Sequence, residues 1–185
     1  FGKNEVSSHY TSLEPRIALN LMAGPNNSFK LSYNRVKQFM FMLSNTTAIS
    51  PVDQWKLCDY HIVPPYVDQF SVGYYLNIPK GSLSTSLEFY YKAISDLVDY
   101  KGGASFISTP HVETLTVTGN QEAYGLEAMV RKGTGKVSGW ISYAYARSFM
   151  QFVSPFPEES INYGKPYPSN YDRPHSFNLV STLKL

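Results

Sequence analysis

The chain has 185 residues, a formal net charge of +2, one cysteine, and an unusual abundance of tyrosine (15) and phenylalanine (11). This length predicts one domain, the small net charge gives no support to nucleic-acid binding, and a single cysteine excludes an internal disulfide. No apolar run reaches the roughly 18 residues of a membrane-spanning helix. Membrane-spanning β-strands are not excluded, because their side chains alternate between apolar and polar and give only a weak hydropathy signal.

The first two expected strands meet at a compact turn. Residues 14–24, EPRIALNLMAG, alternate apolar with polar side chains, and the turn residues GPNNS follow at 24–28. The segment from Phe29 to Leu43 is aromatic and β-rich, yet Arg35 and Lys37 share the parity of its apolar side chains. A β-bulge would explain this, and so would a position at the rim of a sheet; the pattern leaves both open.

A long irregular connection, residues 44–67, precedes a strand with clean alternation, Asp68 to Ile78. The short turn PKGS, residues 79–82, then leads into Leu83–Tyr100, which begins as a strand. Its second half, Leu87–Tyr100, also fits helical spacing, so a helix is the alternative there.

The clearest element is a hairpin, Gln121 to Arg147, which follows a second long loop at 101–120. Apolar side chains recur at every second position from Tyr124 to Val130, and the turn KGTGK contains two glycines that adopt positive φ without steric cost. A third long loop, residues 148–173, contains four prolines and leads to a final strand at 174–185.

The connections alternate between short and long, so the long ones fall at one end of an antiparallel meander. A compact soluble domain rarely has three long structureless loops, whereas outer-membrane barrels combine tight periplasmic turns with long extracellular loops. We therefore predict an all-β fold: an antiparallel up-and-down meander of about seven strands, part of a large transmembrane β-barrel with short periplasmic turns and long extracellular loops.

Several motifs occur in a recognisable order: EPR, SYNRVKQFMFMLSNTT, PVDQW, EFYYK, VDYKGG, AYGLEAMVRK, GWISYAYARS and NYGKPYPSNYDRPH. In this order they resemble the C-terminal β-barrel of a TonB-dependent outer-membrane receptor of the Bacteroidetes type. The likeness covers about residues 14–185, and YGLE and YDRPH are its most specific elements.

The resemblance implies a barrel of about 22 strands that is closed by an N-terminal plug domain and imports a scarce nutrient such as a metal chelate, vitamin, glycan or peptide. Its implied location is the bacterial outer membrane. Its implied partners are outer-membrane lipid, the protein's own plug domain, TonB, and in some receptors a surface lipoprotein. The chain starts at Phe1 without an initiator methionine, so we expect residues 1–185 to be a partial barrel domain of a longer polypeptide.

No catalytic constellation is visible, and we expect neither an enzyme nor a bound cofactor. Cys58 and His61 form a C-x-x-H pair, but a zinc site needs about four ligands and no second pair follows. Binding residues concentrate on loops held by a rigid scaffold. The candidates for substrate contact are the loop side chains Trp55, Tyr60, His61, Phe106, His111, Phe152, Tyr163 and Tyr167.

Four charged residues on the less apolar face are candidates for facing the lumen: Glu88, Lys92, Glu127 and Arg131. We expect them to pair across strands, with contacts to the plug or a substrate as the alternative. We assign a structural role to the two specific motifs, through Tyr124, Gly125, Glu127, Tyr171, Asp172, Arg173, Pro174 and His175. In the second motif, we expect Pro174 to mark a strand start, and Asp172 with Arg173 to fasten the base of a loop.

Two other functions remain open. A soluble β-sandwich that binds a ligand would also have alternating strands, but its loops would be shorter and its two apolar faces would cover each other. A plugless porin or adhesin would use the same wall without a plug domain.

Overall fold

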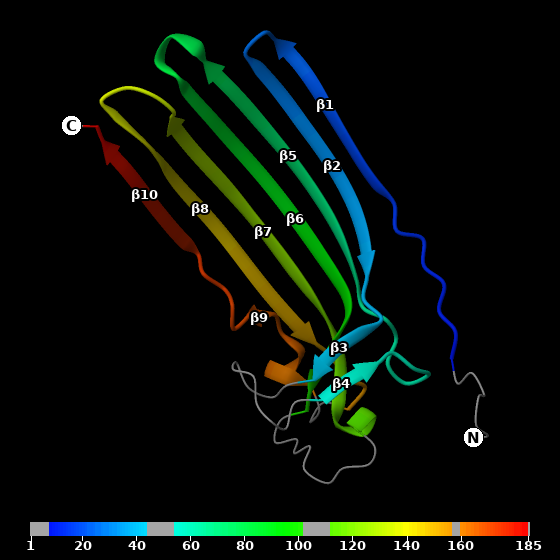
Figure 1. Cartoon of the computed structure of the whole chain (residues 1–185). Coiled ribbons are helices and arrows are strands. Elements are labelled where there is room, and N and C mark those ends of the chain that lie inside the picture. Colours follow the sequence, from blue (N-terminus) through cyan, green and yellow to red (C-terminus); the bar gives the residue numbers. More distant parts are fainter. Residues whose placement is uncertain (1–7, 44–53, 102–111, 157–159, 185) are drawn as a thin grey trace.

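The computed structural model describes residues 8–43, 54–101, 112–156 and 160–184 (Figure 1). Seven strands form the main path of an eight-stranded antiparallel sheet, and each of the seven pairs with the next along this path. In order they are β1 (Arg16–Gly24), β2 (Asn27–Lys37), β5 (Tyr66–Ile78), β6 (Leu83–Tyr100), β7 (Thr116–Lys132), β8 (Val137–Phe152) and β10 (His175–Leu183). The predicted all-β antiparallel meander is confirmed.

Smaller elements lie at the two ends of this sheet, most of them at one end. The strands β3 (Met40–Leu43) and β4 (Gln54–Leu57) form a separate hairpin, and β9 (Tyr167–Pro168) pairs with β8. The 3-10 segments are η1 (Pro79–Gly81), η2 (Val112–Leu115) and η4 (Ile161–Gly164). No helix in the described residues is long and apolar enough to cross a membrane.

The two ends of the sheet differ (Figure 1). Three short connections, residues 25–26, 79–82 and 133–136, lie at one end, which we call the turn end. The long connections and the β3–β4 hairpin lie at the other, which we call the loop end. The predicted alternation of short and long connections is therefore present in the structure.

The helical alternative for Leu87–Tyr100 is wrong, because Leu83–Tyr100 is a single β-strand, β6, that pairs with β7 as far as Tyr100. One β-bulge interrupts that pairing between Ile94 and Leu97, where Asp96 has a φ of 57°. The extra residue shifts the later apolar side chains out of a period of two. The helical spacing arises from this shift together with Tyr90 and Ile94, which are bulky side chains on the same face as Glu88.

The bulge alternative for β2 is also wrong. β2 pairs with β5 without a register shift from Asn27 to Lys37. Arg35 keeps the parity of the apolar side chains but lies at the loop end, where it forms a bidentate ion pair with Asp68 on β5 (2.7 and 2.6 Å). The charge therefore lies at the rim of the sheet.

Three predicted loop boundaries are wrong in the same direction, because strands run further into the loop end than their alternation indicates. β5 begins at Tyr66, β7 at Thr116, and β8 continues to Phe152. A small hydrophobic core at the loop end supports these extensions. Ile62, Val117 and Phe152 are buried in it, with Phe41, Val98, Tyr100 and Leu115 packed around them.

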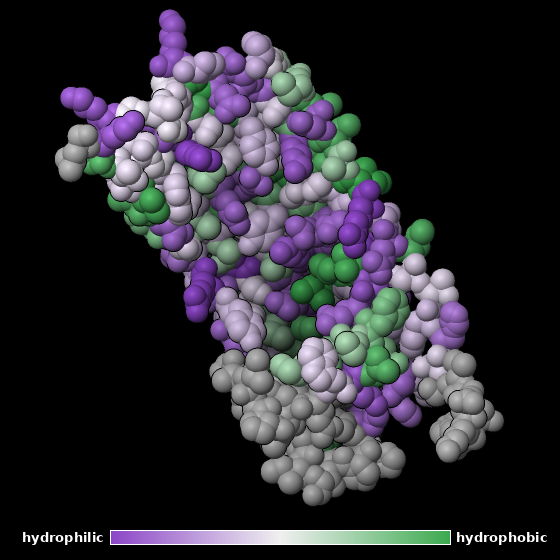
Figure 2. Space-filling model, in the orientation of Figure 1, coloured by the Kyte–Doolittle hydropathy of each residue, from purple (hydrophilic) through white to green (hydrophobic). Residues whose placement is uncertain are grey.

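The register assigns opposite characters to the two faces of the sheet. The apolar face is the one that carries Leu19, Leu31, Val72, Phe89 and Leu126, each of which is the register partner of the next on the adjacent strand. We call polar face the one that carries Lys30, Glu88 and Glu127. The face in view in Figure 2 is mostly hydrophilic, and its hydrophobic residues appear mainly at the margins and near the loop end.

Candidate functional site

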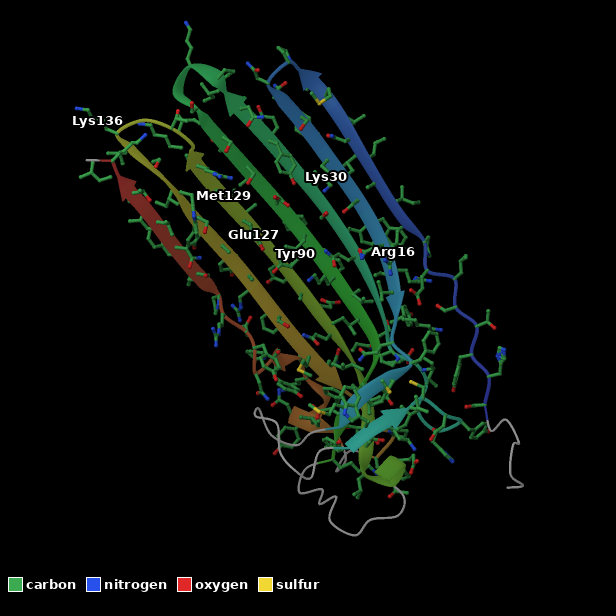
Figure 3. All side chains as sticks on the ribbon, in the orientation of Figure 1. Arg16, Lys30, Tyr90, Glu127, Met129 and Lys136 are labelled. Atoms are coloured by element: carbon green, nitrogen blue, oxygen red, sulfur yellow. The ribbon has the colours of Figure 1, made fainter. Side chains whose placement is uncertain are left out.

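The polar face brings two of the predicted lumen residues directly together. Glu88 on β6 is the register partner of Glu127 on β7, and directly opposed side chains in such a ladder have Cβ atoms about 5 Å apart. Gly73, next in the row, has no side chain, and Lys30 follows it on β2. Figure 3 labels Lys30 on β2 and Glu127 on β7.

The expected charge pairing among the four lumen candidates is wrong for the described residues. Lys92 lies opposite Ala123 and places its ammonium 5.2 Å from the centre of the Tyr90 ring, and Arg131 lies opposite Ser84. The two carboxylates face each other instead, at a cost of a few tenths to about 1 kcal/mol.

A groove of about 460 Å³ lies beside this carboxylate pair. It is hollow because Ser142 and Ala144 on β8 are small. Its wall includes Ser86, Glu88, Glu127, Met129, Trp140 and Asn178. Carboxylates, hydroxyls, an amide and an indole can accept and donate hydrogen bonds to a polar solute. Among the described residues no group of three or more His, Cys, Asp or Glu is placed to hold a metal ion.

The YGLE motif has a structural basis on both faces. The Tyr90 ring lies over Gly125, because a β carbon added to this glycine would come within 2.7 Å of the ring. Tyr124 lies on the apolar face as the register partner of Tyr91, whereas Glu127 lies on the polar face. Any larger residue at Gly125 would displace the aromatic cover from the strand.

The predicted loop contacts do not converge on one site. Trp55 (69% exposed), Tyr60 (84%) and Tyr163 (92%) project from the surface near the loop end, and His61 packs edge-on against Tyr60 at 5.4 Å between ring centres. Tyr167 is half-buried on β9. Phe106 and His111 lie outside the described residues.

Phe152 does not belong to this group, and its assignment as an exposed loop residue is wrong. Its side chain is fully buried as the last residue of β8. It packs on Gly119 of β7, where an added β carbon would come within 2.4 Å of the ring. Phe152 therefore belongs to the loop-end core.

An ion-pair cluster that the sequence pattern missed fastens the long connections to one another. The Lys56 ammonium, on β4, contacts Asp59 at 2.8 Å and also contacts Glu113 of η2. The Asp59 carboxylate accepts the backbone N–H groups of His61 and Ile62 at 2.9 and 3.0 Å. The hydrogen bond from Lys56 lowers the pKa of Glu113. Glu113 is far from Lys56 in sequence, so no local spacing signals the contact.

The YDRPH motif closes the third long connection. Asp172 accepts the Ser148 backbone N–H at 2.7 Å and the Arg147 Nε–H at 3.1 Å, so this carboxylate ties the base of the loop to β8. The cation is Arg147, not Arg173 as expected. β10 begins directly after Pro174, whose carbonyl accepts the Ala146 N–H at 3.2 Å.

The flanking aromatic residues of this motif have different environments. Tyr171 is 77% exposed. The His175 Nδ1 lies 2.8 Å from the Tyr143 hydroxyl, and its ring also packs against Tyr145 at 5.4 Å between centres. These three rings form an aromatic patch on the apolar face near the start of β10.

A scan against protein-family models, a search of curated proteins and a search of solved structures each found no match.

Proposed function

We propose that this chain is a wall segment of an outer-membrane β-barrel receptor of the TonB-dependent type, which imports a scarce nutrient. The observation that carries the proposal is the apolar face, a continuous uncharged surface that no other described element covers. Leu19, Phe70, Val72, Phe89 and Leu126 on it are 40–53% exposed. In water such a surface would be a large unpartnered patch, whereas in a bilayer it is the surface that lipid requires.

The charges on this face lie only at its two ends. Arg35, Asp68, Glu122 and Arg147 mark the loop end by register, and Lys132 marks the turn end. On β8 the uncharged stretch runs from Val137 to Tyr145, about 27 Å at 3.4 Å per residue. A strand tilt of about 40° reduces this height to about 20 Å, close to the roughly 25 Å apolar band of outer-membrane barrels.

Aromatic residues collect towards the loop end of the same face. Tyr33, Phe70, Tyr91 and Tyr124 are consecutive register partners on β2, β5, β6 and β7. The Tyr33 and Phe70 rings are 4.7 Å apart between centres. Rings that join an apolar body to a polar hydroxyl favour the membrane interface, so this row supports an aromatic girdle.

The sheet itself supports membership of a larger barrel. β1 and β10 each have one neighbour, so both present an edge of backbone groups without a strand partner among the described residues. Within a bilayer those groups must be satisfied by further strands. The proposed neighbours are other strands of the same wall, with the polar face lining the lumen.

The assignment to a receptor with a plug, rather than to an open porin, rests on the ordered motif likeness. In that assignment Glu88, Glu127 and the adjacent groove face the plug domain or a passing solute, and the exposed Trp55, Tyr60 and Tyr163 lie on the extracellular side. The periplasmic partner is TonB. A soluble sandwich requires a second layer over the apolar face, and the described residues provide none.

Fractionation and uptake test the two levels of the proposal separately. The full-length protein should remain in the outer-membrane pellet after carbonate washing and should show heat-dependent gel mobility, as closed barrels do. Recovery in the soluble fraction would refute the membrane assignment. Nutrient-dependent growth that is lost on deleting the TonB system supports the receptor. Uptake that is unaffected by that deletion would refute the receptor and favour a plugless porin instead.

A further inference from the structure

The turn end carries a cluster of cations without a neighbouring acid. Lys80, Arg131, Lys132, Lys136 and Lys184 lie in or beside its connections, and residues 24–27, 78–84, 130–138 and 182–184 contain no Asp or Glu. Hydrogen bonds of the backbone and of two hydroxyl groups connect the segments that carry these cations. Figure 3 shows Lys136 extending from the turn between β7 and β8, beyond the sheet.

Two adjacent turns are fastened through Ser82. Its carbonyl accepts the Gly133 N–H at 2.8 Å, and its hydroxyl accepts the Thr134 hydroxyl at 2.7 Å. The Lys184 N–H donates to the Lys136 carbonyl at 2.8 Å, which continues the β8–β10 pairing to the end of the sheet. These hydrogen bonds keep the turns together, so the lysines cannot reduce their mutual repulsion by moving apart.

An apolar groove of about 250 Å³ opens beside these lysines. Its floor is the register row Lys132, Gly139 and Ser181, where two of the three side chains are small or absent. Larger apolar side chains border it: Val130, Val137, Ile141 and Leu179. Gly139 has a φ of 149°, and a β carbon there would come within 2.1 Å of the Val180 carbonyl, so the floor cannot be filled at this position.

The lysine nearest the groove directs its charge towards the turn. A β carbon added to Gly135 would lie 3.6 Å from the Lys132 Nζ, so the ammonium lies over the turn that also carries Lys136. An apolar groove with a cationic mouth is complementary to a molecule that has an acyl chain and an anionic head. The groove lies on the proposed lipid-facing surface, at the level where the uncharged band ends.

We propose that this groove binds an anionic glycerophospholipid, with an acyl chain over Gly139 and Ser181 and the headgroup phosphate on Lys132 and Lys136. This site rests on the proposed membrane function and adds a specific lipid to it. Each lysine near the membrane surface favours an anionic lipid, so two lysines are expected to give at least about a tenfold preference over a zwitterionic lipid.

The test is native mass spectrometry of the detergent-solubilised full-length protein, titrated separately with phosphatidylglycerol, phosphatidylcholine and lipid A. Wild type should bind phosphatidylglycerol at least about tenfold more tightly than phosphatidylcholine. The variant K132Q/K136Q should lose that preference. The control K30Q/K165Q removes the same charge from the polar face and a loop, and should keep it. Ser181→Leu fills the groove floor and should weaken both phospholipids.

Three outcomes would overturn the site: an unchanged preference in K132Q/K136Q, an equal loss in the control, or tighter binding of lipid A than of phosphatidylglycerol. Vesicle flotation of the same wild-type sample separates this failure from failure of the proposed function. A protein that floats with vesicles but shows no lipid preference refutes the site alone. A protein that does not float refutes both.

Discussion

Replacing Leu126 with arginine tests whether lipid covers the apolar face. Leu126 lies in the middle of the uncharged stretch of β7, between its register partners Phe89 and Tyr145. Met129, on the same strand, lies on the polar face between Ser86 and Ser142. The two side chains are almost equally exposed, at 42% and 38%, so in water the two arginines should have similar effects.

A bilayer makes the two substitutions unequal. An arginine on the lipid face near the midplane costs about 2–4 kcal/mol, whereas on a water-filled lumen the cost is small. Leu126→Arg should therefore shift the equilibrium for folding into vesicles by about 30-fold to several hundred-fold relative to Met129→Arg. Val130→Arg should lie between them, because Val130 is one row from Lys132 at the edge of the stretch.

The assay is folding of the full-length variants into phospholipid vesicles across a urea series, monitored by tryptophan fluorescence and by heat-dependent gel mobility. Circular dichroism in detergent micelles controls for a general loss of strand structure. Equal midpoints for Leu126→Arg and Met129→Arg would refute the assignment of the faces. A larger loss for Met129→Arg would reverse it.

Three further predictions concern the loop end. Gly119→Ala forces a β carbon against the Phe152 ring and should destabilise the loop-end core by about 1–3 kcal/mol, seen as faster amide exchange there; unchanged exchange would contradict the packing. Asp172→Ala leaves the two donors it binds unsatisfied, costs about 1–3 kcal/mol, and should expose the 153–174 connection to protease, which an intact digestion pattern would disprove. The folded-state pKa of Glu113 is below its ordinary 4.5, so the stability from its contact with Lys56 is present above pH 4.5 and is lost as the pH falls through the lowered pKa. Protease sensitivity of these loops should rise over that window in wild type, and Lys56→Gln should remove the pH step.

The sheet was predictable because one side of every strand obeys a period of two. The alternation from Tyr124 to Val130 assigns side chains to faces without any knowledge of neighbours, and the glycines of the KGTGK turn mark where the chain reverses. These are local signals. The strand order follows from them as soon as short connections force sequence neighbours to pair.

The missed features depend on distant residues. Phe152 looks like part of a proline-rich loop until Gly119, far from it in sequence, provides the space for its ring. The opposition of Glu88 and Glu127 requires the β6–β7 register, which a bulge beyond both residues leaves undisturbed. Arg147 could not be chosen over Arg173 as the partner of Asp172, because Arg147 lies 25 residues away in the chain and only the fold brings it to the carboxylate.

The bulge at Asp96 allows one strand to serve two sets of neighbours. On the turn-end side of it, every second residue of β6 must suit the apolar face. On the loop-end side, Val98 and Tyr100 pack with the core around Phe152 under a different phase. A residue inserted or deleted at this point changes the phase of the loop-end portion alone. The outer region of the molecule can therefore diversify, in length and in sequence, while the wall keeps its register.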